Sequence, residues 1–244
     1  MLVLSCPYKL RLLEGMLRKS LPQAIVVHGA VMNINRGNPI HHEVIVDSWP
    51  EFKVVLTRPC KEVINSLGDS ERGRERRKEE RIFSQPKGQS KILLDAAAAK
   101  QKKLSVIPYF LLEPGFRLSS LNSSSIDLLN ENWAYGRNQQ SRRYLAKMIQ
   151  HFPGSGILNE EGYLISWMLM DLFGTQAHGY TLPSFRGKGY LAITTKALCM
   201  QAYNAGYPLY GFVVLKNNHM QRALEKGGYQ KVSELSYLCF HDTT

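Results

Sequence analysis

The residues best suited to chemistry lie in one stretch, Tyr180–Tyr190, which reads YTLPSFRGKGY and joins a predicted strand to a predicted helix. Gly187 and Gly189 let a ligand approach the backbone closely, and Arg186 and Lys188 add positive charge. The N–H groups at the start of a helix, with its macrodipole, attract anions. The turn is therefore predicted to bind phosphate or pyrophosphate. Taken alone, it is as consistent with a glycine-rich turn that serves only compactness.

A second unit follows about thirty residues later in the chain. Asn217 ends a predicted strand and begins a predicted helix, which ends at Glu225-Lys226-Gly227-Gly228-Tyr229. Together the two units resemble the GNAT superfamily of acyl-CoA-dependent N-acyltransferases. The acyl-CoA turn of that superfamily has Arg or Gln, then Gly three residues later, and a small residue two positions further on. Arg186 and Gly189 match this pattern, whereas Leu191 stands where the small residue is expected.

Four longer strings resemble the glycine N-acyltransferase family. They are VMNINRGNP (31–39), VDSWPEF (46–52), NWAYGRN (132–138) and HGYTLP (178–183). The resemblance covers about 1–58 and 115–240 and breaks across 59–114. We therefore expect an N-terminal α/β half (1–58) that looks truncated in its middle, an irregular basic segment (59–114), and a C-terminal GNAT domain (115–244).

The fold class that the resemblance implies is α/β (α+β), a mixed twisted sheet with flanking helices. Two adjacent parallel strands, here 175–182 and 208–215, are expected to splay apart so that the pantetheine arm of CoA inserts between them. The resemblance also implies direct attack of an amino-acid nitrogen on acyl-CoA in a ternary complex. No permanently bound cofactor and no metal are implied.

The residue that could act as general base differs from the one the family uses. Thr175 stands where the family has a glutamate, and a hydroxyl is no base near neutral pH. His178 has a suitable intrinsic pKa and becomes the candidate base, with Asp171 as the second candidate. In a regular strand Thr175 and His178 face opposite sides, unless a β-bulge between them realigns the chain. A histidine that merely packs against the sheet is the competing interpretation.

The candidate acyl-CoA-binding residues follow the same resemblance. The backbone near Leu182 is expected to donate to the oxyanion. The position of a possible tyrosine acid falls at Leu224, so that role is vacant or falls to water, Asn217 or Tyr229. Tyr229 is expected in the core, and Trp133 and Trp167 in packing or in the acyl pocket. The residues expected to hold acyl-CoA are Leu182, Arg186, Gly187, Lys188, Gly189, Tyr190 and Asn217.

Periodicity predicts the elements that position these residues. In the N-terminal half we expect a helix at 7–20 and strands at 24–34, 42–47 and 52–57, and then no hydrophobic period across 61–103. Residues 106–111 are predicted to form a linker or an edge strand. The C-terminal half is predicted to contain helices at 125–134, 138–151, 188–205 and 218–227, and strands at 155–159, 163–171, 175–182, 208–215 and 230–240.

Composition limits the remaining classes. The net charge is +11, and residues 71–103 supply +6 of it through eleven basic and five acidic residues. Interspersed glutamates favour a solvated or disordered segment there over a nucleic-acid-binding surface. Four scattered cysteines are typical of reduced thiols and form no metal-binding pattern. The basic amphipathic start of the chain favours a packed first helix over a mitochondrial presequence.

The best interpretation is an acyl-CoA-dependent N-acyltransferase that forms N-acylglycines or related products. The alternatives are a GNAT enzyme that acylates a protein amine and a catalytically impaired paralogue that still binds CoA. By resemblance we expect a mitochondrial location, with a cytoplasmic one as the alternative. The expected partners are acyl-CoA and a small amino acid, with no nucleic acid, no membrane span and a monomeric state.

Overall fold

A computed structural model describes residues 1–60, 89–94, 112–214 and 216–232. These residues form two compact units, an N-terminal one (1–60) and a C-terminal one (89–232). Three expectations fall wholly or partly outside the described residues. They are the 71–103 segment apart from 89–94, the 106–111 stretch, and the end of the strand expected at 230–240.

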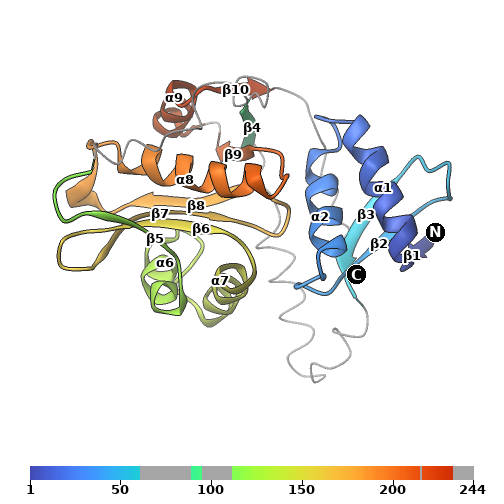
Figure 1. Ribbon diagram of the computed structural model, residues 1–244, viewed down its shortest axis with the longest axis horizontal. Helices are drawn as coiled ribbons and strands as arrows, with labels where there is room; N and C mark the ends of the chain where they lie inside the picture. The colour runs from blue at the N-terminus through green and yellow to red at the C-terminus, as the bar shows by residue number, and fades with distance from the viewer. Residues whose placement is uncertain (61–88, 95–111, 215, 233–244) are drawn as a thin grey trace. The chain divides into compact units, whose positions relative to one another are not determined.

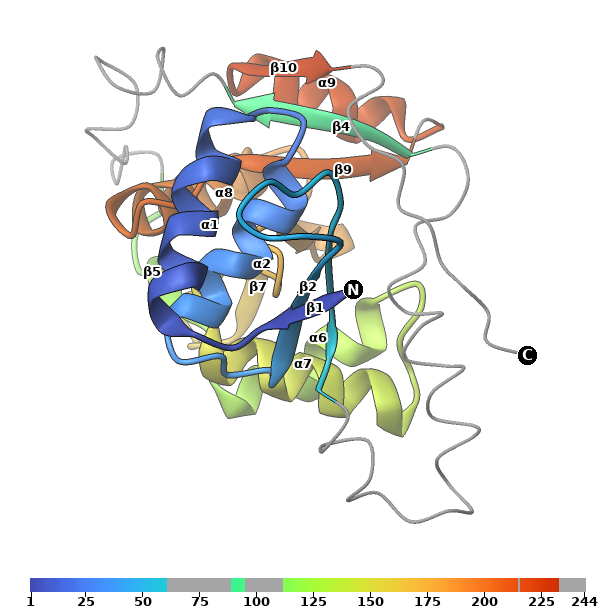
Figure 2. The same cartoon turned by 90° about the vertical axis from the view of Figure 1, so that its right-hand side faces the viewer.

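The N-terminal unit has a three-stranded antiparallel sheet, ordered β1-β2-β3, and two helices. The strands are β1 (Leu2–Leu4), β2 (His42–Val46) and β3 (Val55–Pro59), and the helices are α1 (Pro7–Lys19) and α2 (Ile25–Asn35). Figure 2 shows the two helices side by side. One core joins both helices to the sheet and contains Leu4, Leu10, Leu13, Leu17, Val31, Ile34, Val44 and Val46.

The first helix forms as predicted. Leu10, Leu13 and Leu17 recur at helical spacing and are buried on one face, while Pro7 occupies the first turn. Basic residues in the last turn complement the helix dipole. The apolar face of α1 is thus used for packing within this unit.

The strand expected at 24–34 is a helix, so that prediction is wrong. Nine of the eleven residues of α2 are buried, including His28 and Asn33. A helix that is buried nearly all round loses the period of 3.6 residues and reads as a continuous apolar run. Such a run cannot be distinguished from a buried strand by periodicity.

The C-terminal unit is built on a seven-stranded sheet ordered β10-β4-β9-β8-β7-β6-β5. Its neighbouring strands are antiparallel except for the parallel pair β8 and β9. The strands are β4 (Gln89–Leu94), β5 (Arg117–Ser120), β6 (Gly154–Leu158), β7 (Leu164–Met170), β8 (Gln176–Thr181), β9 (Tyr210–Val214) and β10 (Tyr229–Val232). This mixed sheet with a single parallel step is the expected GNAT arrangement.

Helices cover both faces of this sheet (Figure 1). Helices α6 (Ile126–Asn132) and α7 (Gln139–His151) lie on one face and α8 (Tyr190–Asn204) on the other. Helix α9 (Asn218–Lys226) lies next to β10, and two short 3-10 turns precede α6 and α8, at Ser123–Ser125 and Pro183–Phe185. The predicted helices of this half are confirmed to within two or three residues.

The inner strand β4 has no counterpart in the sequence-based prediction. Residues 89–94 fall in the stretch expected to be irregular, yet they pair with β9 on one side and β10 on the other. Pairing on both sides satisfies the backbone groups of a strand whatever the pattern of its side chains. The strand therefore depends on its neighbours rather than on a local signal.

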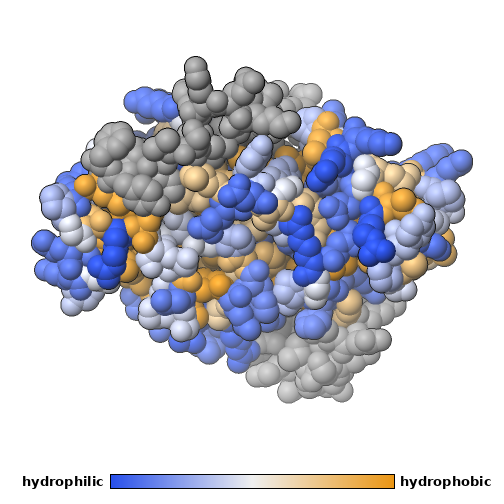
Figure 3. Space-filling view, in the orientation of Figure 1, coloured by the Kyte–Doolittle hydropathy of each residue, from blue (hydrophilic) through white to orange (hydrophobic). Residues whose placement is uncertain are grey.

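The face drawn in Figure 3 is largely hydrophilic, and hydrophobic residues appear there in separate small areas. Among the described residues, no helix has both the length and the apolar character that crossing a bilayer requires.

Candidate active site

The parallel strands β8 and β9 are paired only near their starts. Gln176 of β8 and Gly211 of β9 are the one pair of residues that face each other across the two strands. Beyond this pair, β8 continues to Thr181 without pairing with β9. On its other edge β8 stays paired, and Leu182 N donates to Ile165 O at 2.9 Å. Backbone groups alternate sides along a strand, so the N–H and C=O of Thr181 point to the edge of β8 that is no longer paired with β9.

This edge points to one candidate among the backbone N–H groups near Leu182 that are expected to donate to the oxyanion. The N–H of Leu182 is already bonded to Ile165, whereas that of Thr181 faces the open edge. The carbonyl of Thr181 on the same edge accepts from Nε of Arg186 at 3.0 Å. The Arg186 guanidinium also lies 5.1 Å from the ring centroid of Tyr180. These two contacts of the Arg186 side chain therefore hold the turn against the end of β8.

A β-bulge interrupts β8 at His178. Trp167 pairs with Tyr180 and Leu169 with Ala177, so one residue of β7 opposes both His178 and Gly179. His178 has a positive φ of 55°. A Cβ on Gly179 would lie 2.5 Å from Cε of Met168, which explains the glycine at this bulge.

The bulge reverses the side of the sheet that His178 faces. In a regular strand Gln176 and His178 would share a face. Here Nε2 of Gln176 donates to Sγ of Cys199 in α8, whereas His178 contacts α7 on the opposite face. Because Thr175 precedes Gln176 by one residue, it lies on the α7 side together with His178. The two residues are thus brought to one face, which a regular strand would not allow.

Two aromatic side chains surround the His178 imidazole. The hydroxyl oxygen of Tyr144 lies 3.2 Å from Nε2, and the Trp133 ring approaches edge-on with centroids 4.6 Å apart. Burial lowers the pKa of His178 from 6.5 to about 4. The imidazole is therefore neutral near pH 7, so one ring nitrogen can accept a proton, but the lowered pKa makes it a weaker base than an exposed histidine.

A second polar group lies in the β7–β8 turn. Oδ1 of Asp171 accepts from the N–H groups of Phe173 and Thr175, both at 2.9 Å. Burial raises the pKa of Asp171 to about 6, although the N–H groups and the Thr175 hydroxyl oppose the shift. Tyr210 borders this turn and donates from its hydroxyl to Phe173 O at 2.7 Å. Asp171 is thus held in place and partly buried, not freely exposed at a strand end.

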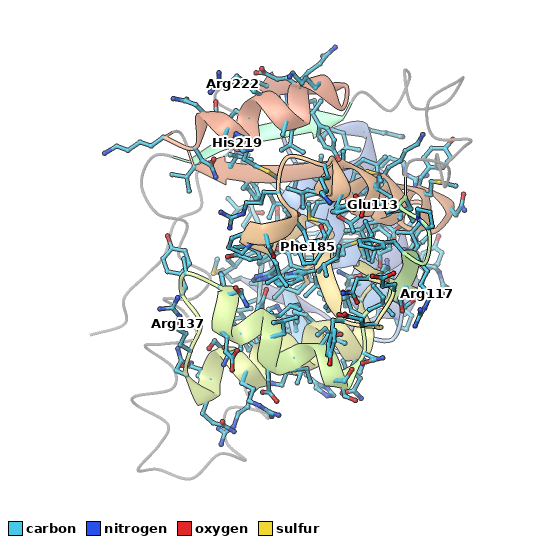
Figure 4. All side chains as sticks on the ribbon, turned by 90° about the vertical axis from the view of Figure 1, so that its left-hand side faces the viewer. Glu113, Arg117, Arg137, Phe185, His219 and Arg222 are labelled. Atoms are coloured by element: carbon cyan, nitrogen blue, oxygen red, sulfur yellow. The ribbon has the colours of Figure 1, made fainter. Side chains whose placement is uncertain are left out.

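The glycine-rich turn leaves room around its backbone. Gly187 and Gly189 have φ of +83° and +82°, and at both positions an added Cβ would have no atom within 4 Å. Gly189 is the N-cap of α8, and no side chain caps the first N–H groups of this helix. In Figure 4 the labelled Phe185 of this turn lies between the Arg137 loop and the α9 residues His219 and Arg222.

Lys188 is paired with an acidic side chain. Its Nζ lies 2.8 Å from Oε1 of Glu113, and both side chains are about half exposed, at 48% and 46%. The pairing raises the pKa of Lys188 and lowers that of Glu113. A phosphate group bound at the turn would compete with Glu113 for this ammonium group.

Three other predicted residues have structural roles. The side chain of Tyr190 is 2% exposed in the core and stacks on Phe116, with ring centroids 5.7 Å apart, so only its backbone N–H is available to a ligand. Asn217 caps α9 by accepting from Met220 N at 3.1 Å. Leu224 is buried and has no acidic proton to give a thiolate.

The core assignments agree with expectation. Tyr229 is buried and its hydroxyl contacts Cys199 and Gln176. Trp167 is buried and stacks on Tyr180 with centroids 5.2 Å apart.

Within the described part of the chain, no three His, Cys, Asp or Glu side chains are gathered as a metal site requires.

Two residues of this site were missed in the sequence, Tyr144 and Glu113. Tyr144 had a weak signal, because Ser141, Tyr144, Leu145 and Met148 follow helical spacing and so face the sheet. Glu113 had none, since 75 residues separate it from Lys188.

Comparison with known proteins assigns this fold and site to a class. A family model described as "Aralkyl acyl-CoA:amino acid N-acyltransferase" matches residues 1–72 and 61–153, and the model of its C-terminal region matches residues 155–235. The protein is an acyltransferase of the GNAT fold. More specifically, the chain belongs to the aralkyl acyl-CoA:amino acid N-acyltransferase family. The family match also runs through 59–114, where the residues alone showed no resemblance.

Curated relatives are similar over nearly the whole chain. Glycine N-acyltransferase of Bos taurus is 29% identical over 279 positions, covering 91% of this chain and 92% of that protein. Glycine N-acyltransferase-like protein 2 of Homo sapiens is 27% identical, with 94% of each covered. The bovine alignment is longer than the 244-residue chain, so the relative has residues that this chain lacks. An X-ray structure of a Drosophila protein shares the fold, with a TM-score of 0.68, 15% identity and 95% of each chain covered.

Proposed function

We propose that this protein transfers an acyl group from a CoA thioester to the amino group of glycine or a related small amino acid. The observation that carries the proposal is the combination of the diverging β8–β9 pair with the glycine-rich turn at the start of α8. An extended pantetheine arm would pair with the open edge of β8, and the pyrophosphate would bind the backbone of Gly187, Lys188 and Gly189. Family membership supports the same reaction.

The proposed chemistry is direct attack in a ternary complex. The amine nitrogen bonds to the thioester carbonyl carbon, the C–S bond breaks, and CoA leaves as a thiolate. His178 takes the proton that the nitrogen loses, and the N–H of Thr181 donates to the oxyanion. Solvent protonates the thiolate, because Leu224 occupies the position of a possible tyrosine acid.

The choice of base rests on position. The bulge directs His178 toward the face that the α6–α7 loop borders, next to the end of β8. Asp171 is the second candidate, because its pKa of about 6 suits proton transfer near neutral pH. Thr175 adjoins Asp171 and is assigned a supporting contact, not the role of a base.

Two assays together test this function. Purified protein is incubated with acetyl-CoA or benzoyl-CoA and with glycine, glutamine or a lysine-containing peptide, and products are identified by mass spectrometry. N-acylglycine would support the proposal, and acylation of the peptide alone would indicate a protein acyltransferase. Calorimetric binding of CoA without any product would identify a CoA-binding paralogue that has lost turnover.

The remaining attributes are also proposals. By family resemblance we propose a mitochondrial location, with a cytoplasmic one as the alternative, and a monomer that uses no resident cofactor or nucleic acid. Subcellular fractionation and light scattering of the purified protein test the location and the monomeric state.

A further inference from the structure

The imidazole of His178 is held by a frame that α6, α7 and their connecting loop provide. Tyr144 lies at hydrogen-bond distance from Nε2, 3.2 Å, and Trp133 meets the ring edge-on at 86°. The rings of Trp133 and Tyr144 contact each other as well, with centroids 5.6 Å apart. The ring is therefore bounded on two sides by side chains that support each other.

The loop that carries Trp133 is rigid for reasons visible in its contacts. Oδ1 of the buried Asn130 accepts from the Ser141 hydroxyl at 2.5 Å and from Arg137 N at 3.2 Å. Arg137 N also donates to Asn130 O at 3.0 Å. A Cβ on Gly136 would overlap Asn130 O, so the loop passes as close to α6 as glycine permits.

The start of α7 is fixed equally well. Asn138 and Ser141 form a capping box, in which Ser141 N donates to Oδ1 of Asn138 at 2.9 Å. Leu145 and Met148 then bury the same face of the helix against the sheet. Tyr144 therefore projects from an anchored helix and has little freedom to move away from His178.

The distance between the Tyr144 hydroxyl and Nε2 is compatible with either tautomer of His178, and the position of Tyr144 at Nε2 favours one of them. Burial, and after it the negative charge of Asp171, raises the pKa of Tyr144 well above its ordinary value, so the phenol keeps its proton. A general base needs an unprotonated ring nitrogen that faces the amine, and Nε2 is already engaged by Tyr144 at 3.2 Å. In a neutral imidazole with Nδ1 as the acceptor, the proton lies on Nε2 and is donated to the phenol oxygen.

We propose that Tyr144 is a positioning residue that holds His178 in the Nε2–H tautomer, which leaves Nδ1 as the proton acceptor for the incoming amine. This inference deepens the proposed function and rests on it for the identity of the proton donor. The hydrogen bond from Nε2–H to Tyr144 persists when Nδ1 is protonated, so Tyr144 also supports the imidazolium that forms.

The test combines turnover with a measurement that needs no turnover. The Y144F variant removes the hydroxyl and keeps the ring, and Y135F is the matched control. Tyr135 also packs on Trp133, with centroids 6.3 Å apart, but its ring is 60% exposed and its contact is with Trp133. We expect kcat to fall about tenfold or more in Y144F, with KM for acyl-CoA unchanged, and no change in Y135F. A Y144F/H178Q double variant should be no slower than H178Q alone.

Imidazole ¹⁵N shifts of His178 in the free protein read the tautomer directly, with H178Q identifying the signal. The expected result is a proton on Nε2 in the wild type and a mixture of tautomers in Y144F. A proton on Nδ1 in the wild type, or an unchanged tautomer in Y144F, would overturn the proposal. If no acceptor is acylated at all, the proposed function fails while the tautomer result still stands, so the two failures are distinguishable.

Discussion

The glycine-rich turn before α8 allows the anion-binding role of its backbone to be separated from its structural role. Gly187 and Gly189 have positive φ, and an added Cβ would meet no atom within 4 Å at either position. In the free protein an alanine therefore incurs only the strain of a left-handed backbone, about 1 kcal/mol. For a chain of this length that strain lowers the melting temperature by about 2–4 °C.

In G187A and G189A the affinity for CoA should fall much more than the folding stability. A methyl group at Gly187 or Gly189 would occupy the space through which a phosphate reaches the backbone N–H groups. Losing one hydrogen bond to a charged group costs about 1.5–3 kcal/mol, which corresponds to a Kd about 10- to 150-fold higher. The assays are calorimetric titration with CoA and thermal unfolding, each performed on G187A and G189A.

Gly162 provides the matched control. Its φ is +86°, in the turn between β6 and β7, and a Cβ there would lie 3.8 Å from Nη2 of Arg117, an ordinary contact. G162A should lose as much thermal stability as the turn variants and bind CoA like the wild type. If G187A and G189A also bind CoA normally, the turn is only a structural connection and the assignment of the pyrophosphate site is wrong.

Four further results are expected. E113Q releases Lys188 from its ion pair, so CoA should bind about two- to fivefold more tightly at low salt, and this gain should disappear at high salt. An unchanged affinity for CoA would mean that Lys188 does not reach the phosphates. G136A forces the loop away from Asn130 O and should lower the free energy of unfolding in urea by about 1–3 kcal/mol, whereas wild-type stability would contradict the close approach. Because the folded-state pKa of His178 is lowered to about 4, its contribution to stability is present above pH 6.5 and is lost as the pH falls toward 4; H178Q should abolish that part of the slope. The pKa of Asp171 is raised to about 6, so its contribution to folding stability declines as the pH rises from about 4 to 6, and D171N should remove this decline. The measurement is the urea midpoint of unfolding across about pH 4.5–7. If H178Q and D171N both show the same pH dependence as the wild type, the burial of His178 and Asp171 is contradicted.

Much of the C-terminal unit was predictable because its elements carry local signals. Strand β7 is a largely apolar run of the right length, and α7 begins at a capping box that the residues Asn138 and Ser141 already suggest. The turn after β8 is marked by a proline and two glycines. Such signals act over a few residues, so they survive without tertiary contacts.

The features that the sequence did not predict depend on contacts with distant segments instead of on local signals. Helix α2 was predicted as a strand, because burial on all sides erased its period. Strand β4 gave no local signal, since its pairing with β9 and β10 comes from segments more than a hundred residues away. The sequence also did not indicate that the side chain of Tyr190 belongs to the core around Ile157 and Ile165, so its predicted contact with acyl-CoA falls to its backbone N–H.

The sequence by itself determined that a positively charged, glycine-rich turn precedes a helix and that a histidine lies nearby on the preceding strand. These are statements about residue types and short spacings, which the chain carries locally. Only the tertiary structure decided that a bulge directs His178 to the α7 face, that Tyr144 meets it, and that Glu113 holds Lys188. The physical reason is that a side chain's direction in a sheet depends on register with the neighbouring strand, and its partners depend on which distant elements pack there.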